Sequence, residues 1–128
     1  MPTSKSKSNA HNLLLEYRAT LWRKAALESV QGTGRKALQA CKERLRLTQE
    51  LVAVLRNNKL LGEKLYWIVF VTYMTDRQPC DIDEILSDIA IKHMPIPRRT
   101  YFRLRGRAIQ MLDNHLNDIR VTSMNYAH

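Results

Sequence analysis

Apolar residues recur along this chain at steps of three and four, the spacing of one face of an α-helix. The clearest case lies between Arg35 and Arg56, where the stripe consists of Leu38, Cys41, Leu45, Thr48, Val52 and Leu55. No segment shows the alternation of apolar and polar residues that two paired strands would need. The sequence therefore predicts an all-α protein.

Glycine, asparagine and proline divide the chain into about five helical stretches. We expect the first over residues 12–30, with Asn12 as its N-cap, ending at Gly32-Thr33-Gly34. Asn57-Asn58 marks a turn after the second stretch. The third, residues 59–74, is apolar on most sides and is expected to lie at the centre of the core. Its β-branched residues also allow a strand, but the chain offers that strand no partner.

Two prolines separate the last two helices. Asp81 is the expected N-cap of the fourth helix, because Glu84 follows three residues later as in a capping box. That helix must stop before Met94-Pro95-Ile96-Pro97, since proline lacks the backbone N–H and disfavours helical geometry in the residue before it. Pro97 suits the first turn of the fifth helix. The apolar stripe expected to hold the fifth helix on the core consists of Tyr101, Leu104, Ala108, Met111, Leu112 and Leu116.

A length of 128 residues with 45% hydrophobic content allows one compact domain. We predict disordered tails at 1–11 and 121–128, a helical hairpin at 12–58 and a helix-turn-helix domain at 59–120. The hairpin is expected to dimerise or to bind a partner such as RNA polymerase. The stripe within 35–56 either packs on its own chain or forms a homodimer seam. It is shorter than the roughly three to four heptads that indicate a coiled coil, which favours packing within the chain.

The charge balance points to a strongly anionic partner. Lys and Arg total 21 against 12 acidic residues, which gives a formal net charge of +9. Nucleic acid and an anionic membrane surface are the two partners of this kind. The polar first residues lack the apolar core of a secretory signal, and the apolar run 65–74 spans about half of the ~20 residues of a membrane helix. We therefore expect a cytoplasmic protein that binds double-stranded DNA and no membrane.

Residues typical of catalytic or metal sites show no suitable spacing. Cys41 and Cys80 are too few for a disulfide framework, and the four histidines match no metal-binding pattern, so no metal or other cofactor is expected. Four acids near the start of the fourth helix could hold magnesium in a nuclease. Helix capping explains them more simply, and we expect no enzymatic activity. These acids are Asp81, Asp83, Glu84 and Asp88.

The segment from Lys92 to Arg107 contains six basic residues and no acid. Two short helices joined by a tight turn, the second beginning in a run of arginines, are the components of a helix-turn-helix. Arg can bond a guanine edge through two hydrogen bonds, Gln can pair with adenine, and a glycine lets the helix backbone approach the duplex. Lys92 and Arg98 suit contacts with phosphates. The other candidate DNA-binding residues are Arg99, Phe102, Arg103, Gly106, Arg107 and Gln110.

Three stretches also resemble a known group of proteins. They are Leu65-Tyr66-Trp67 through Thr72-Tyr73-Met74, then Asp83-Glu84-Ile85-Leu86, and finally Arg99 to Arg105 with Arg107-Ala108-Ile109 and Leu112. Over about residues 61–116 the chain is similar to proteins akin to the fourth region of bacterial sigma factors. The likeness is greatest to the ArpU/RinA-type transcription regulators of phages and mobile elements in Gram-positive bacteria.

This resemblance implies that Arg99, Thr100 and Arg103 contact DNA in the major groove. It implies a structural role for Tyr101, Ala108, Ile109 and Leu112. The turn at 94–97 and the loop at 76–81 are longer than in the family. The angle between the two helices, and with it the arginine that reaches a base, is therefore left open.

The expected function is a sequence-specific DNA-binding transcriptional regulator encoded by a phage or mobile element. The alternative is a non-catalytic helical adaptor that binds RNA polymerase or another acidic protein through the basic helix. A structured-RNA binder is a third hypothesis, and a merely solvated basic face a fourth. A second basic run is either the solvated side of its helix or another phosphate-contacting surface. It consists of Arg35, Lys36, Lys42, Arg44 and Arg46.

Overall fold

The computed structural model describes residues 8–30, 32 and 34–126, with the backbone alone for 120–126. Within these residues there are five α-helices and no strand, which confirms the all-α prediction. They are α1 (Asn9–Glu28), α2 (Arg35–Ala53), α3 (Gly62–Val69), α4 (Ile82–Lys92) and α5 (Arg98–Tyr126). A 3₁₀ turn, η1 (Val54–Asn57), continues α2, and a π-helical turn, η2 (Phe70–Met74), continues α3.

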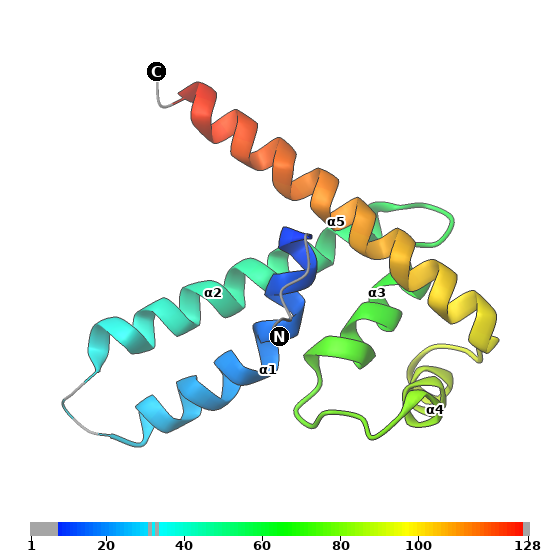
Figure 1. The fold of residues 1–128 in the computed structure, drawn as a ribbon, viewed down its shortest axis with the longest axis horizontal. Helices are drawn as coiled ribbons and strands as arrows, with labels where there is room; N and C mark the ends of the chain where they lie inside the picture. The colour runs from blue at the N-terminus through cyan, green and yellow to red at the C-terminus, as the bar shows by residue number, and fades with distance from the viewer. Residues whose placement is uncertain (1–7, 31, 33, 127–128) are drawn as a thin grey trace, which may run out of the picture.

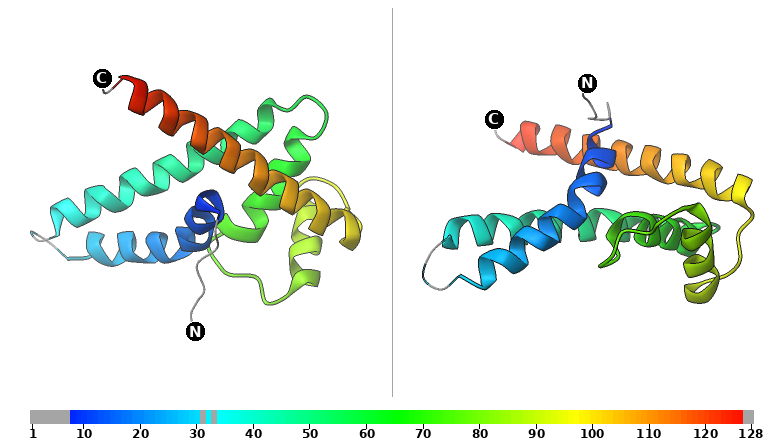
Figure 2. Two further views of the ribbon diagram at one scale, coloured as in Figure 1. Left: turned by 45° about the horizontal axis from the view of Figure 1, so that its top comes forward. Right: turned by 60° about the horizontal axis from the view of Figure 1, so that its bottom comes forward.

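Helices α1 and α2 form a hairpin, α3 and α4 lie beside it, and α5 connects the two parts. Helices α1 and α2 lie side by side and project from one side of α3, whereas α4 lies on the other side (Figure 1). Helix α5 crosses over α3 and runs back toward the hairpin, as both views of Figure 2 show. Contacts of α5 with α1, α2 and α3 hold the hairpin and the carboxy-terminal helices together.

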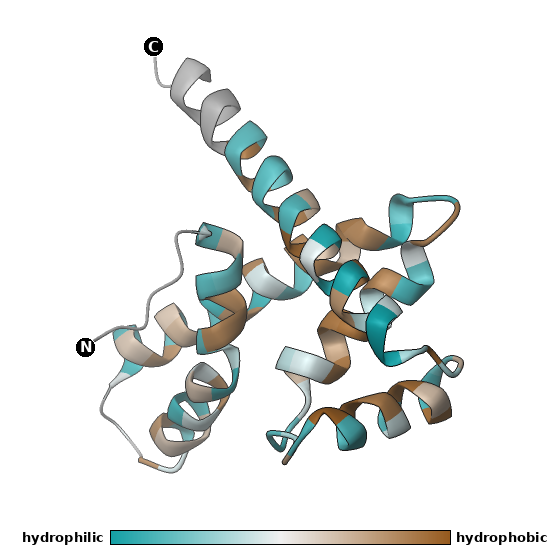
Figure 3. Cartoon of the chain, turned by 45° about the vertical axis from the view of Figure 1, so that its right-hand side comes forward, coloured by the Kyte–Doolittle hydropathy of each residue, from teal (hydrophilic) through white to brown (hydrophobic). Residues whose placement is uncertain are grey.

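A single hydrophobic core runs through the described residues. Its members come from all five helices, and the largest fully buried side chains include Leu14, Leu55, Leu65, Ile68, Ile89, Tyr101, Leu104 and Leu112. Figure 3 shows α3 as a largely hydrophobic helix at the centre, and the first turns of α5 as mostly hydrophilic. The core crosses residue 58, so the hairpin and the carboxy-terminal helices pack as one body.

The stripe of α2 packs within its own chain. All of its members except the half-buried Leu38 are buried, and α1 is the main neighbour of α2. Gln49 Nε2 donates a hydrogen bond to Tyr17 Oη across the hairpin at 2.8 Å, and Arg44 pairs with Glu16. The stripe is therefore occupied in a single chain. A homodimer through residues 35–56 would have to use another face of α2.

The first helix begins earlier, and the last ends later, than predicted. The Ser8 side chain accepts a hydrogen bond from the backbone N–H of His11 at 3.0 Å, so Ser8 is the N-cap of α1 and Asn12 is not. Residues 9–11, predicted as tail, are therefore helical, while residues 1–7 lie outside the described part. At the other end α5 continues through 121–126, also predicted as tail. Residues 127–128 are not described.

The turn between α4 and α5 follows the sequence closely. Asp81 Oδ1 accepts the backbone N–H of Glu84 at 2.9 Å, which confirms the predicted cap of α4. Helix α4 ends at Lys92, and α5 begins at Arg98, with the Tyr101 N–H donating to Pro97 O at 2.9 Å. Pro97 therefore precedes the first turn of α5. On α4, Ile89 is buried, and the half-buried apolar residues are Ile82, Ile85, Leu86 and Ala90.

The third helix begins at Gly62, three residues later than predicted. Asn58 Oδ1 accepts the N–H groups of Leu60 and Leu61 at 3.1 and 2.9 Å, and this turn delays the helix. Gly62 lies close against the end of η1. A Cβ at Gly62 would lie 2.9 Å from the carbonyl oxygens of both Leu55 and Arg56, so only glycine fits without a shift.

Candidate nucleic-acid interface

The inner face of α5 fixes the rotation of the helix. Tyr101, Leu104, Ala108, Leu112 and Leu116 are buried as predicted, and Met111 is half-buried. Tyr101 is fully buried, and its hydroxyl lies 2.7 Å from Thr72 Oγ1 on η2. Thr72 uses its single hydroxyl hydrogen on Ile68 O at 2.6 Å, so the hydroxyl of Tyr101 is the donor between the two. A buried ring with a directed hydrogen bond holds one orientation of α5.

The outer face of α5 consequently presents its predicted residues to solvent. Arg99, Arg103, Gly106, Arg107 and Gln110 are all exposed. We call these five residues the outer face. Among the described residues, no carboxylate pairs with any of its three arginines. The Gln110 amide donates to Asn114 Oδ1 at 3.1 Å, which holds Gln110 along the helix surface.

Four arginines elsewhere in the described chain form ion pairs with glutamates. Arg46 contacts both Glu43 and Glu50 at 2.9 Å, and Arg56 contacts Glu63 at 3.0 Å. Arg44 and Arg77 pair with Glu16 and Glu84. The arginines of the outer face have no such partner among the described residues, and together they create a local positive potential on the first turns of α5. The pairing of Arg44 and Arg46 favours the solvated-side interpretation of the α2 basic run.

Phe102 lies at the edge of the outer face and is 41% exposed. The Arg98 guanidinium lies 6.0 Å from the centre of its ring, and that of Arg105 lies 5.2 Å away. Arg105 also lies 5.6 Å from the centre of the Tyr101 ring. These cation–π contacts hold Arg98 and Arg105 beside the same aromatic side chain. Arg105 was not among the predicted site residues, because the helical projection turns it toward the apolar stripe.

Two predicted residues lie apart from the outer face. Thr100 is half-buried in the first turn of α5. Lys92, at the end of α4, lines a hollow of about 340 Å³ together with Asp76, Arg77, Glu84 and Asp88. Its charged neighbours in this hollow are thus three acids and one arginine, and no residue of α5 lines it.

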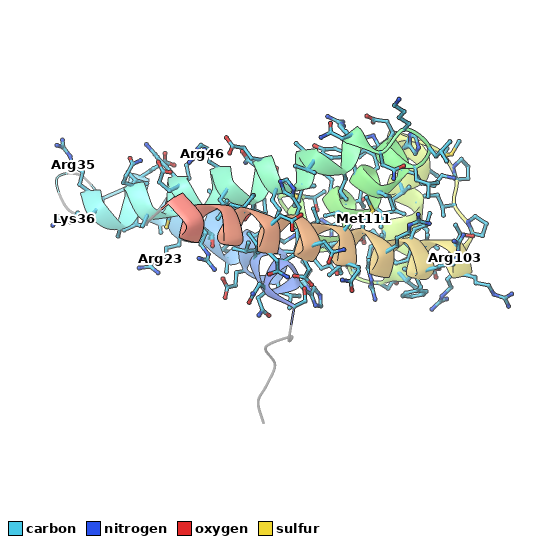
Figure 4. All side chains as sticks on the ribbon, turned by 90° about the horizontal axis from the view of Figure 1, so that it is seen from above. Arg23, Arg35, Lys36, Arg46, Arg103 and Met111 are labelled. Carbon is cyan, nitrogen blue, oxygen red and sulfur yellow. The ribbon has the colours of Figure 1, made fainter. Side chains whose placement is uncertain are left out.

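The start of the α2 basic run is distant from the outer face. Figure 4 shows Arg35 and Lys36 at one end of the molecule and Arg103 at the other. Arg35, Lys36 and Lys42 are exposed and make no ion pair with any described carboxylate. They provide matched control positions for tests of the outer face.

No known family matches the chain. Comparison with protein-family models, with curated proteins and with solved structures found no match. Among the described residues, no three His, Cys, Asp or Glu side chains gather where they could hold a metal ion. None of the described helices is long and apolar enough to cross a bilayer.

Proposed function

We propose that this chain is a sequence-specific DNA-binding protein that places the outer face of α5 in the major groove and regulates transcription. The observation that carries the proposal is the row of exposed, uncompensated arginines on a helix whose rotation the core fixes. The width of the major groove admits one α-helix. Regulation of transcription, and an origin in a phage or mobile element, rest on the resemblance to sigma-factor-like regulators. The proposal requires no catalysis.

In this proposal α4, the proline turn and α5 form the helix-turn-helix. Helix α3 supports this unit, because it contacts both α4 and α5. Arg99 and Arg103 contact base edges, and Gln110 contacts a base edge about two turns farther along α5. Arg98 and Arg107, nearer the sides of the helix, contact phosphates, which position the protein without conveying sequence information.

Titration of ¹⁵N-labelled protein with duplex DNA tests where binding occurs. We expect the largest amide shifts in residues 98–110 and small shifts in residues 35–44 at the far end of the hairpin. The outer face lies on α5, and amides beside a docked duplex change environment most. Shifts centred on residues 35–44, with α5 unaffected, would contradict the proposal.

Gly106 provides a second test, because stability and binding should change in opposite directions. A Cβ at Gly106 would meet no atom within 4 Å, so the chain itself has no steric need for glycine there. Gly106→Ala should raise the free energy of unfolding by about 0.5–1 kcal/mol, the cost of a helical glycine. The added methyl should weaken DNA binding, because it hinders close approach of the helix backbone. Urea unfolding and a fluorescence binding assay measure the two effects. Unchanged affinity would show that Gly106 does not lie at the interface.

A further inference from the structure

A hollow of about 400 Å³ lies between α1, η2 and α5, next to the outer face. Gly106 of the outer face and Phe102 at its edge both line this hollow. The other lining residues are His11, Leu15, Thr72, Tyr73, Arg105 and Ile109. The amino-terminal turns of α1 thus form one wall of a depression whose opposite wall belongs to the DNA-binding helix.

Contacts from two elements hold His11 in this wall. Its Nε2 atom lies 3.3 Å from the Tyr73 hydroxyl on η2, and the two rings meet edge to face with centroids 5.8 Å apart. Asp113 of α5 accepts the backbone N–H of Ala10 at 2.9 Å, which fastens the first turn of α1 to α5. The position of the imidazole is therefore set by the fold.

Arg105 faces the same hollow. It makes no ion pair with a described carboxylate, and its guanidinium lies against the rings of Tyr101 and Phe102. Burial, and then the positive charge of Arg105, lower the pKa of His11, while Asp113 opposes them. Two groups that can carry positive charge thus share a hollow whose described lining residues include no carboxylate, while Asp113 acts on His11 from outside that lining. An anion bound there would relieve their repulsion.

We propose that Arg105 and His11 form a binding site for one backbone phosphate of the DNA duplex that α5 contacts. This inference rests on the proposed function. Residues at the side of a helix in the major groove face the phosphates that border the groove, and Arg105 lies at that side of α5. Arg and protonated His are strong donors to phosphate oxygens. The site makes α1 part of the DNA-binding surface, which gives the hairpin a function beyond packing.

The dependence of affinity on salt tests the role of Arg105. Arg105→Gln should reduce the slope of log affinity against log salt by about one, because one phosphate contact is lost. It should weaken binding to the preferred and to scrambled duplex by the same factor. The matched control Lys42→Gln removes one exposed charge of α2 and should leave the slope unchanged. An unchanged slope in a folded Arg105→Gln protein overturns the proposal.

The pKa of His11 provides a measurement that does not depend on Arg105, whose loss could also loosen the Tyr101 and Phe102 rings. A bound phosphate favours the charged imidazole, so DNA should raise the pKa of His11. Burial beside Tyr73 and the charge of Arg105 act in the opposite direction, and Asp113 acts in the same direction as the phosphate. A group whose pKa rises on binding takes up a proton, so affinity should increase as the pH falls from about 8 to about 5.5. His11→Gln should remove this dependence. A pKa for His11 that is the same with and without DNA contradicts the site.

Titration with inorganic phosphate separates this proposal from the proposed function. If DNA binds but Arg105→Gln and His11→Gln behave as wild type, the phosphate site is wrong and the function stands. If DNA does not bind but inorganic phosphate raises the pKa of His11 saturably, DNA is not the source of the anion and the proposed function fails. If DNA does not bind and inorganic phosphate leaves the pKa of His11 unchanged, both proposals fail.

Discussion

Replacement of both Arg99 and Arg103 by alanine is expected to lower the affinity for a preferred DNA site by at least ~30-fold. A bidentate contact between arginine and guanine contributes about 1–3 kcal/mol to discrimination, and about 1.4 kcal/mol corresponds to a factor of ten. Both side chains are exposed on the outer face and carry no structural contact within the described chain, so the variant should remain folded. Affinity for the preferred and for a scrambled duplex, measured by fluorescence anisotropy, gives the result.

Two controls separate base recognition from charge. Arg35→Ala with Lys36→Ala removes the same charge from the opposite end of the molecule and should weaken all DNA binding only slightly. Arg99→Lys with Arg103→Lys keeps the charge but removes the planar two-donor geometry, and should reduce base preference strongly. Under the adaptor hypothesis, in which α5 binds an acidic protein, the lysine variant should behave as wild type. A lysine variant with full base preference would therefore contradict direct recognition by these arginines.

The largest effect on stability is expected from Gly62→Ala. The added Cβ would lie 2.9 Å from two backbone carbonyl oxygens, and backbone cannot move aside as a flexible side chain can. The Gly62 N–H also donates to Asn58 O at 3.0 Å, which keeps α3 close to η1. Overpacking of this kind costs about 1–3 kcal/mol, and a loss near the upper end is expected because the clash is with backbone. Urea unfolding measures it.

Gly106→Ala is the matched control, since it adds the same methyl group to the same residue type in open space. The two variants should change the free energy of unfolding in opposite directions. A Gly62→Ala protein as stable as wild type would show that α3 and η1 separate easily at this turn. That result would contradict the close packing on which the position of α3, and through it of α5, depends.

Local patterns were sufficient for the parts of the site that lie on one helix. The stripe from Tyr101 to Leu116 and the opposite outer face follow from helical periodicity, which depends only on neighbouring residues. The cap at Asp81 was predicted correctly for the same reason. The cap of α1 was predicted at the wrong residue because Ser8 and Asn12 are both good capping residues. Packing of Ala10, which is fully buried, decides between them in favour of the earlier start.

Features that depend on tertiary packing could not be predicted. His11 and Arg105 lie on the first and last helices, and no local pattern relates them. The π-helical turn at Phe70–Met74 has no sequence signature, although it aligns Thr72 with Tyr101. Ile91 is 79% exposed although it lies among the isoleucines of α4. An apolar pattern predicts which side of a helix is hydrophobic, but not how much of that side packs against another helix. Lys92 was assigned to phosphates from its place in the chain, whereas the fold places it in a hollow with Asp76, Glu84, Asp88 and Arg77.

Selection of bound duplexes from a random DNA pool tests the central claim most directly. The intact chain should enrich one motif, and its affinity for that motif should exceed that for scrambled duplex by at least ~10³. The arrangement of half-sites in the motif would also show whether two copies bind with two-fold symmetry. Equal binding to both duplexes, with a steep dependence on salt, would mean that α5 acts only as a polycation. That result would contradict sequence-specific recognition by this protein.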